Sequence, residues 1–458
     1  MVLVDQCRGY AVLLSHLSLI AVPAVQSRDT HRSYIVADTD TAVMVQRDQP
    51  TALHSSVNCA SSSSSQACTC SVDLVVRCQG QTATHVPRFS PEVDRVFAEL
   101  NMAGANVRNL HPDDFLELRV RRVVLNGNQL GDGLTDYVFS SLGNHLTSLM
   151  LGACAIRKLP QRLLVDLTQL EVLHLWNNHI DVIPDSFFVA NSELRELSLW
   201  GNRLMTIRNR TFSSLVQLRL LDLERNRITT LEHGTLSHTR GALQVLRLSN
   251  NHISALSDLS FTDLHQLRIL TLASNRLSFI DARSFVGLHQ LQTLCIANNR
   301  IQYLADGAFQ HLLRLRRLDL SGNRLDRVWA GTFVGLNSLT SVDLSRNRLS
   351  RLPEATFSQS HALRRLILDD NRLSTLGRCS LSSCSKIRSI SLIGNVMECD
   401  CRLVWIGRLD AAATTISGNC VQGGNSGQHE LILPVHKTFS YVDYRFCSLD
   451  DIYYPCLL

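Results

Sequence analysis

An asparagine recurs along most of the chain at a spacing of 24 residues, and this repeat limits the fold more than any other feature. The asparagines are Asn128, Asn178, Asn202, Asn226, Asn251, Asn275, Asn299, Asn323, Asn347, Asn371 and Asn395. One step is 25 residues, and Cys154 divides the 50-residue gap after Asn128 into 26 and 24. With a degenerate copy that begins at Phe97, the chain of 458 residues holds 13 copies. Such units bury their apolar side chains only against their neighbours, so we expect one continuous solenoid.

Each copy carries the phrase L-x-x-L-x-L-x-x-N-x-L or a close variant, as between Leu218 and Ile228. Its Leu-x-Leu alternation has a period of two, which predicts a short strand with one buried face and a parallel sheet along one side of the coils. The asparagine amide can bond backbone groups in the turn that follows, and Cys154 takes the same structural slot. A later apolar residue predicts a buried spine on the opposite side: Phe188, Phe212, Phe261, Phe285, Phe309, Phe333 and Phe357, with Leu236 in the longer copy.

The phrase resembles that of the leucine-rich repeat family. Cysteine clusters flank the array, in "CASSSSSQACTCSVDLVVRC" and "GNVMECDCRLVWIGRL", and they resemble the caps of extracellular members such as Toll-like receptors, Slit and chondroadherin. The resemblance covers residues 59–447. It implies an α/β-class leucine-rich repeat solenoid, shaped as a horseshoe, with a parallel β-sheet on the concave face, a mostly irregular or short-helical convex side and disulfide-bonded caps.

This reading predicts six segments. They are a signal peptide at 1–24, a flexible polar segment at 25–58, an N-terminal cysteine cap at 59–87, about 13 repeats at 93–398, a C-terminal cysteine cap at 399–447 and a tail at 448–458.

The family's caps imply the disulfides Cys59–Cys70, Cys68–Cys78, Cys399–Cys420 and Cys401–Cys447. Zinc is the competing interpretation of such clusters, but pairs separated by one residue fit its usual spacing poorly. Cys379 and Cys384 are close enough to pair in a loop. Cys295 occupies a slot that we expect to be exposed, and Cys456 in the tail either links two chains or stays a free thiol.

The N-terminus indicates export, because an uncharged, mostly apolar run at residues 10–25 follows Arg8 and contains small residues suited to cleavage. No later run of about 20 apolar residues exists, so we expect a secreted protein without a membrane span. The net charge of +5 does not indicate a nucleic-acid partner. Asn209 begins the chain's single N-glycosylation sequon.

The sequence contains no motif that indicates catalysis. It has no P-loop, no H-E-x-x-H, no G-x-S-x-G and no dinucleotide-binding glycine fingerprint. We therefore expect neither an enzyme nor a cofactor or metal site, and function must come from surface recognition.

The solvent-facing slots of each strand lie six, four and two residues before the asparagine. The last of these slots holds a tryptophan in two adjacent copies, Trp176 and Trp200, which we expect to stack as neighbouring rungs about 4.8 Å apart. The candidate ligand-binding set on this concave face is Trp176, Trp200, His174, Glu196, Asp222, Glu224 and Arg247. Rigid aromatic side chains beside charge favour a binding hot spot. The alternative is that the two indoles only pack against each other.

A second surface feature is a column of arginines directly after the asparagines: Arg203, Arg227, Arg276, Arg300, Arg324, Arg348 and Arg372. Aligned guanidinium groups suit sulfated glycans. The alternative is that N-R-L is common filler in this family. Asp319 and Asp343 form a smaller acidic rung that we expect to be merely solvated.

We therefore expect a secreted protein that binds an extracellular protein ligand through its concave face, in the matrix, in adhesion or in receptor-like recognition. Two alternatives stay open: the ectodomain of a membrane receptor of Toll-like or neuronal adhesion type, and a non-catalytic carrier subunit of a secreted enzyme complex.

Overall fold

The structure is a computed structural model. It describes residues 68–78, 80, 83–87, 95–231, 234–236, 239, 242–256, 260–398, 403, 405–406, 414–422 and 431–434, all of which belong to the unit formed by residues 56–458. The expected signal peptide, flexible segment and tail lie outside the described residues. So do Cys59, Cys399, Cys401, Cys447 and Cys456, and with them three of the four implied cap disulfides and the chain-linking role of Cys456.

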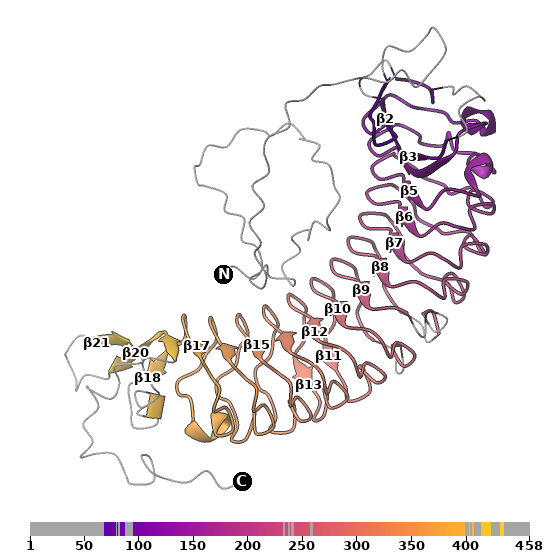
Figure 1. Cartoon of the computed structure of the whole chain (residues 1–458). Helices are drawn as coiled ribbons and strands as arrows, with labels where there is room; N and C mark the ends of the chain where they lie inside the picture. The colour runs from indigo at the N-terminus through magenta and orange to yellow at the C-terminus, as the bar shows by residue number, and fades with distance from the viewer. Residues whose placement is uncertain are drawn as a thin grey trace. The chain divides into compact units, whose positions relative to one another are not determined.

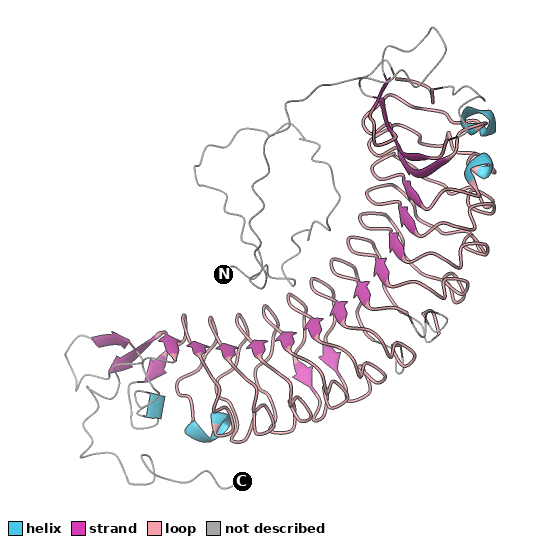
Figure 2. Cartoon of the chain, viewed as in Figure 1, coloured by secondary structure: helices cyan, strands magenta, loops and turns pink. Residues whose placement is uncertain are grey.

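The described coils share one sheet of 16 strands, which lines the inner side of the curved stack (Figures 1 and 2). In order, its strands are β1 (Cys68–Cys70), β2 (Val75–Cys78), β3 (Phe97–Asn101), β4 (Val120–Val124), β5 (Ser148–Met150), β6 (Val172–His174), β7 (Glu196–Ser198), β8 (Leu220–Asp222), β9 (Val245–Arg247), β10 (Ile269–Thr271), β12 (Thr293–Cys295), β14 (Arg317–Asp319), β15 (Ser341–Asp343), β16 (Arg365–Ile367), β17 (Ser389–Ser391) and β19 (Thr415–Ser417). All neighbours are parallel except β1 and β2. The middle residue of each three-residue strand from β5 to β17 is buried, as the alternation predicts.

The outer side of the described coils is mostly turns. Its regular elements are the 3₁₀ helices η1 (Pro112–Phe115), η2 (Ser140–Leu142) and η4 (Arg378–Leu381), and a two-stranded parallel sheet of β11 (Phe279–Ile280) and β13 (Tyr303–Leu304). A third sheet contains β18 (Met397–Glu398), β20 (Asn419–Gln422) and β21 (Leu431–Pro434). The predicted solenoid, with its parallel sheet and little helix, is confirmed.

The repeated asparagines tie each coil to the one before it. The Nδ2 of Asn178 donates to the carbonyl of Leu175 at 2.9 Å and, across the coil boundary, to that of Leu151 at 2.8 Å. Its Oδ1 accepts the backbone N–H of Ile156 at 3.0 Å. The same pattern recurs through Asn395, so a buried amide satisfies backbone groups that the turn hides from water. Cys154 keeps part of this role, because its thiol lies 3.1 Å from the carbonyl oxygen of Leu125.

The residue before each repeated asparagine, and before Cys154, adopts a left-handed conformation, with φ between 53° and 75°. These residues are Gly127, Ala153, Asn177, Gly201, Arg225, Asn250, Ser274, Asn298, Gly322, Arg346, Asp370 and Gly394. This conformation reverses the chain at the strand end. Glycine and asparagine tolerate it best, which explains their frequency in this column.

The predicted phenylalanine spine is buried on the opposite side, together with Leu236. Rings in adjacent coils stack: Phe285 and Phe309 lie 6.0 Å apart between centroids, and Phe333 and Phe357 lie 5.0 Å apart. Each ring fills the space between two coils, so the spine and the asparagines hold the two sides of the stack together.

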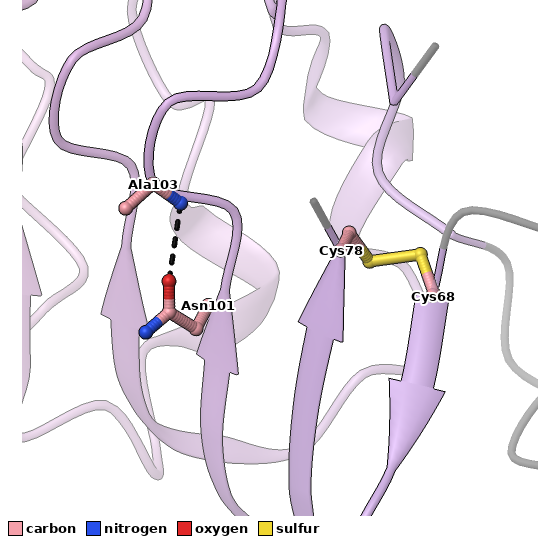
Figure 3. Close-up of a disulfide and its surroundings, with 4 residues drawn as sticks. All are labelled: Cys68, Cys78, Asn101 and Ala103. Atoms are coloured by element: carbon pink, nitrogen blue, oxygen red, sulfur yellow. Dashed lines mark hydrogen bonds between the residues drawn. A yellow bond between two sulfur atoms is a disulfide. The ribbon is translucent and has the colours of Figure 1, made fainter. Parts of the chain in front are cut away.

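The N-terminal edge of the sheet is a hairpin. β1 runs antiparallel to β2, and a disulfide joins Cys68 to Cys78 across the pair (Figure 3). This bond was expected from the resemblance. One strand further, Oδ1 of Asn101 accepts the N–H of Ala103 at 3.1 Å and closes the first turn (Figure 3).

Substituting one buried asparagine tests the ladder. Asn299→Ala leaves the carbonyls of Leu272 and Ile296 and the N–H of Leu277 without their amide partner. Because unsatisfied buried polar groups are costly, we expect a loss of about 2 kcal/mol in the free energy of unfolding, measured by chemical denaturation. Asn337→Ala, at an exposed position, is the control and should change it by less than about 0.5 kcal/mol. Equal losses in the two variants would contradict the ladder's role.

Candidate binding surface

The repeat places the seven predicted concave residues on four consecutive coils. His174 ends β6, Glu196 begins β7, Asp222 ends β8 and Arg247 ends β9. Trp176, Trp200 and Glu224 each lie two residues beyond a strand, in the turn. We call this set the central concave patch.

Four of its polar side chains form pairs across coil boundaries. His174 Nε2 lies 3.0 Å from Glu196 Oε1, in the adjacent coil. Arg247 Nη1 donates to Asp222 Oδ2 at 3.3 Å, again between adjacent coils. These bonds fix the side chains before any ligand arrives.

Glu224 reaches further than its neighbours do. Its Oε1 accepts the hydroxyl of Thr271 at 2.9 Å, two coils away. The patch therefore continues to β10, and Thr271 is a member that the sequence pattern did not indicate. Nothing in the repeat marks a bond that spans two coils.

The carboxyl groups of the patch do not share one electrostatic environment. The hydrogen bond from His174 holds the pKa of Glu196 below its ordinary value, against an opposing effect of burial. At Asp222 burial is the larger effect and raises the pKa, although the N–H of Glu224 and Arg247 favour the carboxylate. The negative charge of the patch is thus more firmly held at Glu196 than at Asp222.

The expected stacking of the two tryptophans is wrong. Both indoles are half-buried, but the ring contacts among the described residues do not join Trp176 to Trp200. Trp176 lies over Gly152 instead, where a Cβ would be only 2.2 Å from its Cε2. The guanidinium of Arg225 lies 5.2 Å from the ring centroid of Trp200. Each indole therefore packs on its own partner in an adjacent coil.

Sequence reasoning missed both of these partners. Gly152 stands in the same slot as Trp176 one coil earlier, and the absence of a side chain there was the available signal. Arg225 stands in the left-handed column, where glycine and asparagine are the commonest residues and Arg346 is a second arginine. A cationic side chain in the coil directly after Trp200 was the available signal.

All seven members of the arginine column are exposed. Their backbone N–H groups continue the coil-to-coil bonding, as in Arg300, which donates to the carbonyl of Leu277 at 2.9 Å. The ion pairs recorded among the described residues include none of the seven side chains. Their positive charges are thus not neutralised within this part of the chain.

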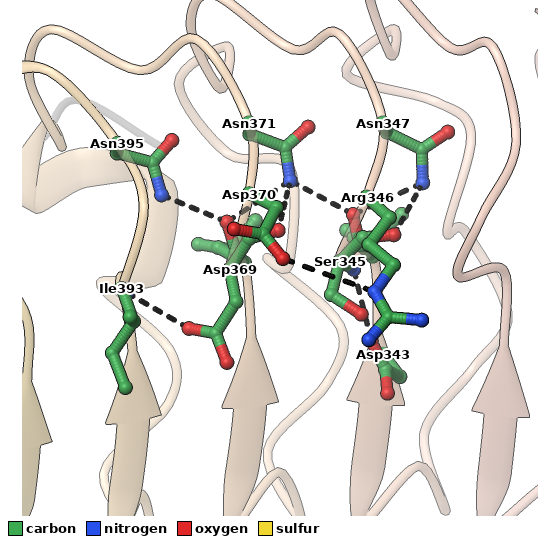
Figure 4. A network of polar contacts seen from close by, with 11 residues as sticks. Asp343, Ser345, Arg346, Asn347, Asp369, Asp370, Asn371, Ile393 and Asn395 are labelled. Carbon is green, nitrogen blue, oxygen red and sulfur yellow. Dashed lines mark hydrogen bonds and ion pairs between the residues drawn. The ribbon is translucent and has the colours of Figure 1, made fainter.

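The acidic rung has a local structural role. Oδ1 of Asp343 accepts the N–H of Ser345 at 2.9 Å (Figure 4). Asp319 does the same for Ser321. Asp369 instead accepts the N–H of Ile393 at 2.9 Å, one coil on (Figure 4). Asp319 and Asp343 thus close turns at strand ends, and Asp369 joins two coils, which is more than the solvation we expected for the rung.

The expected disulfide between Cys379 and Cys384 is wrong. Cys384 is a free, buried thiol, and Cys379 takes part in another disulfide. Cys384 stands 13 residues after Asn371, a slot that holds the buried Leu288 and Leu312 in other coils. Its side chain therefore faces the core, and burial raises the pKa of the thiol to about 12.

Two further predicted residues, Cys295 and Asn209, can be placed in the structure. Cys295 is fully buried and disulfide-bonded, which corrects the exposed slot that we expected. Asn209 is exposed. The described parts of the chain contain no group of three or more His, Cys, Asp or Glu side chains placed to hold a metal ion. Within the same parts, no helix has the length and apolar character that a bilayer span requires.

The family is shown by comparison with known proteins. The leucine-rich repeat family model matches residues 168–228, 192–240, 241–301, 290–349 and 337–397, which together cover half of the chain. The chain belongs to the leucine-rich repeat proteins. No curated protein sequence matches it.

The solved structures that share the fold include the following three. The TLR13 chain of a TLR13–ssRNA13 complex is 24% identical with a TM-score of 0.50, and the match covers 69% of this chain and 53% of that one. An internalin, InlF of Listeria monocytogenes, is 21% identical with a TM-score of 0.54, covering 70% and 85%. A chain of the octameric complex of Latrophilin 3, Unc5D and FLRT2 (LRR) is 20% identical with a TM-score of 0.52, covering 85% and 99%. This leucine-rich repeat chain thus spans about half the length of the TLR13 chain.

The pair of His174 and Glu196 predicts a pH dependence of stability. Folding lowers the pKa of Glu196, so its carboxylate stabilises the folded state. This stabilisation is fully present above the ordinary carboxyl pKa of about 4.3, and it is lost as the pH falls through the lower pKa of the folded state. We expect wild type to exceed Glu196→Gln in unfolding free energy by less than about 1 kcal/mol at neutral pH. Denaturation curves should show this difference narrowing below about pH 4. A difference that stays constant down to acid pH would contradict the assignment.

Proposed function

We propose that this protein acts outside the cell and binds a protein ligand on its concave face, with the central concave patch as the contact area. One observation carries the proposal: two partly exposed indoles, Trp176 and Trp200, are held by partners in adjacent coils beside side chains that are already paired. A surface that is ordered before binding loses little conformational freedom in the complex. Half-exposed tryptophans beside charged groups are typical anchors of protein interfaces.

Two observations support an extracellular location. Cys68 and Cys78 form a disulfide, and such bonds persist in oxidising compartments. The fold is that of proteins whose solved structures include receptor and adhesion complexes. The alternatives of a receptor ectodomain and a carrier subunit use the same surface, and the identity of the captured partner distinguishes them: a soluble signal, a matrix protein or an active enzyme.

Removing the indoles tests the patch. We expect Trp176→Ala/Trp200→Ala to weaken partner capture by about tenfold or more, because each substitution deletes an interface anchor. The measurement is proximity labelling and pull-down with the full chain, followed by titration of the captured partner. Tyr303→Ala, which removes an exposed aromatic side chain from β13 on the outer side, is the matched control.

Two outcomes have opposite meanings. Loss of capture in the double variant alone, with unchanged thermal unfolding, supports the patch. Unchanged capture by a normally folded double variant contradicts it. Because Trp176 also covers Gly152, the double variant can lose thermal stability. In that case, partner capture by the single variant Trp200→Ala tests the patch.

We also propose that the arginine column binds sulfated glycans. The favouring observation is that all seven side chains are exposed and that no ion pair among the described residues neutralises them. Adjacent coils lie about 4.8 Å apart at the sheet, so the five arginines from Arg276 to Arg372, one in each consecutive coil, present a line of positive charge.

Salt dependence tests the column. Retention on immobilised heparin should weaken as the salt concentration rises, because counterions screen exposed charges over about 10 Å at 0.1 M. Arg276→Ser/Arg300→Ser should elute at lower salt than wild type. Arg208→Ser is the control, since this exposed arginine already pairs with Asp185 at 2.9 Å. Retention that does not respond to salt would contradict glycan binding by the arginine column.

A further inference from the structure

A pocket of about 510 Å³ opens beside the arginine column. Its lining includes Arg348 and Arg372 of the column, together with Arg327, Arg351 and Trp329. The pocket is thus built from three consecutive coils. Its volume lies in the range of small-molecule sites, which is about 300–1,000 Å³.

The pocket carries an excess of positive charge. Its lining contains four arginines and one carboxylate, Asp326. That carboxylate lies 3.4 Å from Nε of Arg327, on an exposed pair. The ion pairs among the described residues give no acidic partner to Arg348, Arg351 or Arg372. Three guanidinium groups that are not neutralised at one pocket suit an oxyanion such as a sulfate ester.

Trp329 adds a flat apolar surface to this charge. Its side chain belongs to a residue that is 42% exposed, in a turn where its N–H is held by the Thr332 hydroxyl at 2.9 Å. The guanidinium of Arg327 lies 5.8 Å from its ring centroid. A large aromatic side chain that the core does not require, beside unneutralised arginines, favours a ligand that has both a ring and an anionic group.

We propose that this pocket binds one sulfated sugar residue of a linear sulfated glycan, with its sulfate on Arg348 and Arg372 and its ring against Trp329. The inference rests on the proposed function of the arginine column and deepens it. The column extends from the pocket over the preceding coils through Arg324, Arg300 and Arg276, so the site continues as a line of charge. A ligand with many anionic groups along a chain matches this arrangement better than a single sulfated tyrosine does.

The test uses the full chain and a fluorescent heparin hexasaccharide, titrated at about 0.15 M salt. Trp329→Ala leaves the charge unchanged and should raise the Kd by about fivefold, from the loss of one aromatic contact. Arg348→Ser/Arg372→Ser should raise it by about tenfold or more. Arg276→Ser/Arg300→Ser removes the same charge from the column outside the pocket and should raise it by about threefold or less. Thermal unfolding checks that each variant is folded.

Each outcome decides a separate point. If the two double arginine variants raise the Kd equally and Trp329→Ala does not change it, the pocket proposal is overturned, whereas the proposal that the arginine column binds glycans is retained. Failure of the wild-type chain to bind the hexasaccharide overturns both. Binding of the fully desulfated hexasaccharide as tightly as the sulfated one also overturns the pocket. The pocket proposal is likewise overturned if the chain binds a tyrosine-sulfated peptide tightly, in a way that depends on Trp329, but does not bind the hexasaccharide.

Discussion

The bond between a buried asparagine amide and the backbone of two coils is the interaction on which the rest of the structure depends. Each strand ends in a sharp turn whose carbonyl and N–H groups are shut away from water, and no strand partner can satisfy them. The amide has both a donor and an acceptor, so Asn178 bonds Leu151 and Ile156 of the preceding coil. Because this bond repeats coil after coil, it sets the register in which every other side chain meets its neighbour.

That register leaves the solvent-facing slots free of any demand from the core. The central concave patch uses this freedom, since His174, Glu196, Asp222 and Arg247 pair across coils without disturbing a buried leucine. The left-handed column is less free, because its backbone favours glycine and asparagine. Arg225 departs from that preference, as Arg346 does, and its guanidinium lies over the ring of Trp200.

The two proposed surfaces differ in how their charges are held. In the concave patch the charged side chains are held by hydrogen bonds to neighbouring coils, so a ligand meets an ordered surface and shape governs the fit. The arginine column and the pocket at Trp329 keep positive charge without a partner among the described residues. Binding there depends on long-range attraction, so it responds to ionic strength far more than binding at the patch does.

The sequence by itself determined the solenoid, its strands, the asparagine ladder, the phenylalanine spine and the side on which Trp176 and Trp200 lie, because a strict period of 24 residues repeats the same backbone path. The resemblance to extracellular members supplied the Cys68–Cys78 bond, and the structure contains it. Only the tertiary structure decided which side chains meet: Trp176 covers Gly152, Trp200 contacts Arg225, Cys384 enters a leucine slot, and a pocket forms beside Trp329. Periodicity places a residue on a face, whereas its partner in the next coil depends on side-chain size, rotamer and burial, which the repeat does not encode.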